Sequence, residues 1–182
     1  MKSLQNNTQT RQTKYTIVDI AEMGMMLALI EAVKRALEFI PNVEMVTLLF
    51  ILFSIYYGKR VILVSFAFTA LETFVWGIST WNVMYLYIWP LLIIIVCLSR
   101  KHGSYIFYAL LSAFYGLFFG ALCSIPYFFI GGPVMMFNWW ISGIPYDILH
   151  CISNFILCLI LFKPLSSALS KISRLNKNRI AY

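Results

Sequence analysis

The chain has 182 residues, of which 61% are apolar or aromatic and only 12% are charged, about half the charged share of an ordinary soluble domain. One membrane-spanning helix needs roughly 20 apolar residues, so this composition supplies between about five and six spans. These figures exclude soluble enzymes, nucleic-acid binders, disordered chains and small secreted disulfide domains. They favour an all-α integral membrane protein.

Six apolar segments follow one another along the chain, and each is predicted to be a helix, because an open strand cannot satisfy its backbone hydrogen bonds in lipid. The segments are expected at residues 17–39, 43–57, 61–78, 84–98, 104–125 and 139–162. The first is expected to end at Pro41, and Pro90 is expected to break the fourth. Residues 126–138, with Gly131 and Gly132, are expected to form an outer loop that acts as a lid.

These segments predict one membrane domain over residues 1–182. It comprises a polar N-terminus at 1–16, a six-transmembrane-helix bundle at 17–162 and a basic tail at 163–182. No internal repeat or linker divides the chain.

The basic residues gather at alternate connections between the segments. Of the 14 Lys and Arg residues, all except Lys34 and Arg35 fall in the N-terminus, the turns at 59–60 and 100–101, or the tail. The positive-inside rule then places both termini in the cytoplasm, and six spans satisfy every basic cluster.

Lys34 and Arg35 lie near the outer end of the first segment, with Glu31 and Glu38 at helical spacing on either side. Two interpretations remain open for this charged group. It is either a neutralised helix end that reaches the membrane interface, or a charged wall of an outward-facing site.

Small residues recur every four positions in the first segment, at Gly24, Ala28, Ala32 and Ala36. Such a stripe lets a second helix approach closely, which in a membrane drives association through packing. It indicates either an internal helix contact or a docking face for another subunit.

Polar residues inside apolar segments are costly, so they normally face the bundle interior or a wet cavity. Glu72 lies near the outer end of the third segment, and Asp147, His150 and Asn154 share one face of the sixth. Asp147 and His150 are expected either to bind a ligand or to hydrogen-bond each other and tie helices together.

Aromatic residues are concentrated at the outer side, where all five tryptophans fall, and this asymmetry favours an aromatic-lined pocket that opens outward. The predicted ligand-binding residues are Glu72, Trp76, Asn82, Tyr85, Trp89, Asn138, Trp139, Trp140, Asp147 and His150. We predict no metal site, cofactor or catalytic residue. The four cysteines lie in apolar runs without metal-ligand spacing, and the chain has no phosphate-binding loop for ATP.

The chain resembles the substrate-binding S-components of energy-coupling factor (ECF) transporters. The resemblance rests on its length, the six segments, the A-x-x-x-A stripe and the absence of an ATPase motif, with the most similar stretches at residues 24–44 (GMMLALIEAVKRALEFIPNVE) and 82–90 (NVMYLYIWP). It implies a multi-pass protein of a bacterial cell membrane that binds a vitamin near the outer face. The PNVE run and the Trp-Pro pair look most like the cobalamin-type members, while pantothenate, a pyridoxine-type vitamer and a queuosine precursor stay open.

The resemblance also implies partners, namely a transmembrane coupling subunit that docks on the stripe at Ala28, Ala32 and Ala36, and two ATPase subunits. Release of substrate then follows as the S-component topples in the membrane. Two other classes of function are kept beside this one. They are a membrane scaffold without a ligand of its own, and an intramembrane enzyme that uses Glu72, Asp147 and His150 as acid–base groups.

Overall fold

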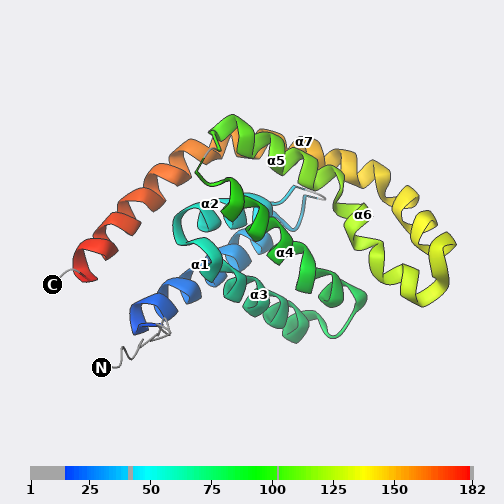
Figure 1. Cartoon of the computed structure of the whole chain (residues 1–182). Helices are drawn as coiled ribbons and strands as arrows, with labels where there is room; N and C mark the ends of the chain where they lie inside the picture. The colour runs from blue at the N-terminus through cyan, green and yellow to red at the C-terminus, as the bar shows by residue number, and fades with distance from the viewer. Residues whose placement is uncertain (1–14, 41–42, 102, 181–182) are drawn as a thin grey trace, which may run out of the picture.

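The computed structural model describes residues 15–40, 43–101 and 103–180, and this part of the chain is helical without any strand (Figure 1). The elements are α1 (Ile17–Leu37), α2 (Val46–Tyr57), the short 3-10 helix η1 (Gly58–Arg60), α3 (Val61–Trp76), α4 (Thr80–Ser99), α5 (Tyr105–Leu117), α6 (Phe119–Cys123) and α7 (Ile125–Ile180). The predicted all-helical class is confirmed. Residues 1–14 of the expected polar N-terminus, the expected helix end at Pro41, and His102 lie outside the described residues.

Three stretches of the described chain are long and apolar enough to cross a membrane, at Val46–Trp76, Thr80–Ser99 and Ile125–Ser173. The outer faces of the helices are apolar as well. Leu63, Ile94 and Leu110, on three different helices, are each between 42% and 45% exposed. A chain with apolar helices and an apolar exterior is embedded in a membrane.

Helix α2 lies in the core, where α1, α3, α4 and α7 contact it. Every residue from Val46 to Ser54 is buried, as expected for a helix that is apolar on all sides. At 12 residues, α2 is about 18 Å long, which is shorter than the hydrocarbon core of a bilayer. Because its residues from Val46 to Ser54 are buried, neighbouring helices rather than lipid cover most of its surface.

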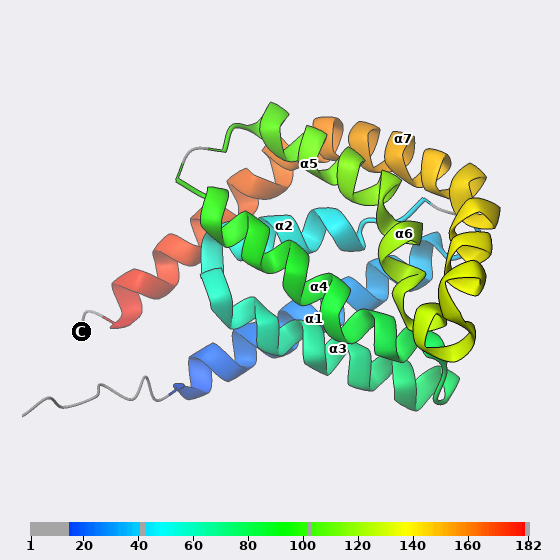
Figure 2. The same ribbon diagram turned by 45° about the vertical axis from the view of Figure 1, so that its right-hand side comes forward.

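The connections between helices lie alternately at two ends of the molecule (Figure 2). The start of α1, η1, the α4–α5 connection and the end of α7 lie at one end. The α3–α4 connection and the bend of α7 lie at the other. The two ends of the described chain are thus on the same side of the bundle, which we call the terminal end.

Two of the expected breaks are wrong. Residues 126–138 do not form a loop, since α7 runs through them and departs from helical geometry only at Gly131 and Gly132. Gly132 has φ +79°, which a residue with a side chain rarely adopts, and Pro133 then begins the second limb of α7, where proline is tolerated. Helix α4 continues through Pro90, because a membrane helix can satisfy the freed carbonyl by local adjustment.

The last segment is longer than predicted. Helix α7 continues past residue 162 and through Pro164 to Ile180, so most of the expected tail is helical. Its apolar span and the polar residues beyond it form one continuous helix.

Candidate functional site

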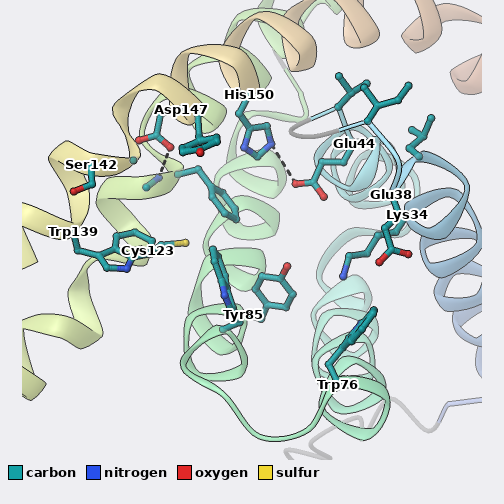
Figure 3. A pocket seen from close by; sticks show the side chains of 18 of the residues that line it. Lys34, Glu38, Glu44, Trp76, Tyr85, Cys123, Trp139, Ser142, Asp147 and His150 are labelled. Carbon is teal, nitrogen blue, oxygen red and sulfur yellow. Dashed lines mark hydrogen bonds and ion pairs between the residues drawn. The ribbon is translucent and has the colours of Figure 1, made fainter.

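A cavity of about 650 Å³ opens at the end of the bundle opposite the terminal end, within the size range of small-molecule sites (Figure 3). It lies between the last turns of α1 and α3, the first turns of α4, helix α6 and the second limb of α7. Its lining residues are Lys34, Arg35, Leu37, Glu38, Ile40, Val43, Glu44, Trp76, Trp81, Tyr85, Phe119, Gly120, Cys123, Trp139, Ser142, Gly143, Tyr146, Asp147 and His150.

Half of the predicted ligand-binding residues line this cavity, namely Trp76, Tyr85, Trp139, Asp147 and His150. They come from the consecutive helices α3 and α4 and from α7, which is distant from both in sequence. A smaller hollow shares Lys34, Trp76, Trp81 and Tyr85 with the cavity and adds the predicted residues Glu72 and Asn82.

Three predicted residues do not line either space. Trp89 is 1% exposed in the core and stacks on Phe50, with ring centroids 5.1 Å apart. Asn138 is exposed, and Trp140 packs edge-to-face on Phe137. The rotation of each helix about its axis turns these three side chains away from the cavity.

Asn82 has a local structural role as well as a place in the smaller hollow. Its side-chain Oδ1 accepts hydrogen bonds from the Ser79 backbone N–H at 2.5 Å and from the Ser79 hydroxyl at 3.1 Å. This arrangement caps the start of α4.

Glu72 is 5% exposed and binds both basic residues of α1. One carboxylate oxygen accepts from Lys34, and the other accepts from Arg35 Nη2 at 3.0 Å. Arg35 also lies 3.6 Å from both Glu31 and Glu38. Lys34 and Arg35 therefore link α1 to Glu72 of α3. Lys34, Arg35 and Glu38 line the cavity, so the interpretation as a charged wall fits this part of the group.

Aromatic rings contact the same two basic residues. The Lys34 ammonium lies 5.5 Å from the Phe68 ring centroid and 5.8 Å from that of Tyr85. The Arg35 guanidinium lies 4.8 Å from the Trp76 ring centroid. All three distances are within the range of cation–π attraction.

Asp147 is 5% exposed, and one side of its carboxylate is already engaged. Oδ1 accepts from the Gly120 backbone N–H at 2.9 Å, whereas Oδ2 has no hydrogen-bond partner among the described residues. A buried acceptor without a partner is costly, so such a group in a cavity wall is a strong candidate for ligand contact.

His150 is one turn further along α7 and faces a different partner. Its Nε2 lies 3.4 Å from Glu44 Oε1, in the connection between α1 and α2. Asn154, the third member of this face, donates from Nδ2 to the Ser112 carbonyl at 3.3 Å. The alternative in which Asp147 and His150 hydrogen-bond each other is wrong, because Asp147 accepts from Gly120 of α6 and His150 lies against Glu44 of the α1–α2 connection.

Three tryptophan-containing contacts build the aromatic part of the wall. Trp81 and Trp139 meet edge-to-face at 6.2 Å, which brings the start of α4 against α7. Trp81 also meets Tyr85 at 6.4 Å, and Tyr127 stacks on Trp139 at 4.9 Å. Large rings supply contact area with few rotatable bonds, which suits them to hold a ligand.

Sequence reasoning missed Glu44 and the glycines against which α7 packs. Glu44 falls at the start of the expected second segment, and nothing in one helix predicts its position beside His150. Gly116 and Gly120 form a G-x-x-x-G pattern, which indicates close packing of a second helix in a membrane. This pattern could have predicted their role from the sequence. A Cβ on Gly116 would lie 2.9 Å from the His150 backbone, so these glycines permit the close packing of α5 and α6 on α7.

All four small residues of the α1 stripe, Gly24, Ala28, Ala32 and Ala36, are exposed. Nothing lies within 4 Å of the position that a Cβ would occupy on Gly24. The alternative in which the stripe is an internal helix contact is therefore wrong for this chain. The stripe and the cavity-lining residues of α1 lie on different faces of this helix.

No group of three or more His, Cys, Asp or Glu side chains is placed to hold a metal ion within the described part of the chain. All four cysteines are free thiols. Cys123 and Cys158 are buried and Cys97 and Cys151 are half-buried.

Comparisons of the chain with protein-family models, with curated proteins and with solved structures find no match.

Proposed function

We propose that this protein is a solute-binding membrane subunit, the substrate-specificity component of an ATP-driven micronutrient importer, and that it is not itself an enzyme. The observation that carries the proposal is the 650 Å³ cavity with aromatic walls and an unpartnered buried carboxylate oxygen on Asp147. A cavity with a few convergent polar groups in an apolar wall is the usual form of a small-molecule site.

We infer six spans with both termini in the cytoplasm, a topology that suits uptake from outside. The connections alternate between the two ends of the bundle, and Lys59 and Arg60 lie at the terminal end in η1. Under the positive-inside rule that end is cytoplasmic, and the cavity then opens to the outer face.

The exposed stripe on α1 supports a membrane partner. Helices associate in lipid where small residues let backbones approach, and this stripe has no partner helix within the described chain. A transmembrane coupling subunit would dock there, and two ATPase subunits would supply the energy that this chain has no motif to obtain.

A scaffold role is the second candidate, and the same stripe favours it. The two functions differ in whether the chain holds a small molecule. The intramembrane enzyme is weaker, because Glu72 is engaged by two basic residues. Among the described residues, the candidate nucleophiles of the cavity wall are not paired with a base either, since the Ser142 hydroxyl donates to the Asn138 carbonyl and Cys123 is a buried thiol.

The test is to purify the full chain in mild detergent from cells grown in rich medium, denature it, and identify released small molecules by mass spectrometry. We expect one compound in near-stoichiometric amount, a corrinoid being recognisable by its visible absorption. We also expect its loss in a Trp139→Ala variant and its retention in the matched Trp140→Ala variant, since Trp140 does not line the cavity. Absence of any retained or stabilising solute, with intact recovery of membrane partners, would establish the scaffold instead.

A further inference from the structure

Among the charged side chains around the cavity, carboxyl groups outnumber basic groups. Lys34 and Arg35 are the basic residues in its wall, whereas Glu38, Glu44 and Asp147 are the acidic ones. Glu31 and Glu72 lie directly behind, as partners of the two basic residues. The cavity region thus holds five carboxyl groups against two basic side chains, with His150 in addition.

The basic residues are not free to receive an anion. Glu72 binds both of them, Glu31 and Glu38 add contacts to Arg35, and aromatic rings contact both basic side chains, which are 20% and 32% exposed. An anionic ligand would have to displace a carboxylate that is 5% exposed and replace both of its interactions. This is unfavourable, because breaking a buried ion pair leaves a charge without compensation.

The acidic groups on the opposite wall are less fully engaged. Asp147 receives one hydrogen bond at Oδ1 and none at Oδ2, and Glu44 has His150 at 3.4 Å. The charge in the cavity wall that still lacks a partner is therefore negative, and a positively charged ligand can pair with it. Figure 3 shows Asp147, His150 and Glu44 along one side of the cavity and Trp139, Tyr85 and Trp76 along the other.

We propose that the cavity binds an organic cation, a flat ring compound whose protonated nitrogen pairs with the Asp147 carboxylate while its ring lies against Trp139 and Trp81. The inference rests on the proposed solute-binding function and narrows its substrate class. Aromatic faces attract cations, and a charge-assisted hydrogen bond to a carboxylate is shorter and stronger than a neutral one. The arrangement selects against anionic compounds of the same shape.

Three indole compounds that differ mainly in charge provide the test. Tryptamine is a cation, tryptophol is neutral and indole-3-acetate is an anion. Their dissociation constants for the purified full chain, emptied of endogenous solute, are measured by thermal stabilisation in detergent. We expect tryptamine to bind most tightly and indole-3-acetate least tightly.

The variant Asp147→Asn keeps the size of the side chain and an acceptor for the Gly120 N–H. It should weaken tryptamine by about 10- to 150-fold and leave tryptophol nearly unchanged. The matched control is Glu22→Gln, which removes one carboxyl group of α1 that does not line the cavity, and it should retain the wild-type preference. Should Asp147→Asn fail to fold, Glu44→Gln takes its place, and a reduced preference for the cation is again expected.

Equal or tighter binding of tryptophol or indole-3-acetate would overturn the inference. If none of the three probes binds, the compound released from the native protein decides, since a ligand without a protonated or permanently cationic nitrogen overturns the inference and one with it supports it. A released anionic or neutral solute would leave the proposed function intact. A chain that releases no solute and binds no probe would remove both.

Discussion

Gly120 and Asp147 fit together so closely that residue 120 has no room for a side chain. The Gly120 N–H donates to Oδ1 at 2.9 Å, and a Cβ at this position would lie 2.4 Å from Oδ2. Gly120 thereby holds the carboxylate at the cavity wall, although it contributes no side chain of its own. The orientation of the acidic group on α7 depends on a glycine in α6.

Replacement of Gly120 should therefore damage binding through Asp147. Gly120→Ala forces the carboxylate or α6 to shift, and we expect a loss of about 1–3 kcal/mol in the free energy of unfolding together with weaker ligand binding. Thermal unfolding and ligand titration on one preparation measure both effects. Gly24→Ala, where nothing lies within 4 Å, is the control and should be neutral or slightly stabilising. A Gly120→Ala protein with wild-type affinity would show that Asp147 is positioned by other contacts.

Glu72 should be important for stability, because it neutralises two basic side chains between α1 and α3. Glu72→Ala leaves Lys34 without its carboxylate, and we expect a cost of about 3–5 kcal/mol, as for other broken buried pairs. Unfolding in detergent checks this value. Glu38→Ala removes a carboxylate whose side chain is 55% exposed, so a loss below about 1 kcal/mol is expected there. Similar losses for the two variants would contradict the assigned role of Glu72.

The exposed stripe predicts a selective defect in assembly. Ala32→Trp should prevent close approach of a partner helix and reduce recovery of the complex, while the isolated chain keeps its ligand affinity. Co-purification of the membrane partners measures the first and ligand titration the second. Ala70→Trp, an equal change at an exposed position of α3, should leave recovery unchanged. Normal recovery with Ala32→Trp would exclude the stripe as the docking face.

Single cysteines test the orientation of the bundle. In a background without the four native cysteines, Ile78→Cys at the cavity end should react in intact cells with a reagent that does not cross membranes. Ser167→Cys at the terminal end should react only after the cells are opened. Both positions are exposed, so access to the thiol depends on the side of the membrane. Labelling of residue 167 in intact cells would reverse the orientation.

Much of the local structure follows from the order of residues along the chain. The apolar segments predict the starts of α1 and α3, and the spacing of Asp147, His150 and Asn154 predicts one polar face on α7. These features depend on hydropathy and on the period of the helix, which act over a few turns. The same reasoning wrongly placed a loop at residues 126–138. Glycine and proline allow a break in a helix, but they do not require a whole segment to be non-helical.

Which side chains come together in the site depends on how elements far apart in sequence pack against one another. Glu72 meets Lys34 and Arg35, and Glu44 meets His150, across distances along the chain that no periodic pattern covers. Trp89 and Trp139 have the same chemistry, yet one is in the core and the other lines the cavity. The physical reason is that the rotation of each helix about its axis is set by packing against its neighbours, and this rotation decides whether a side chain meets lipid, protein or the cavity.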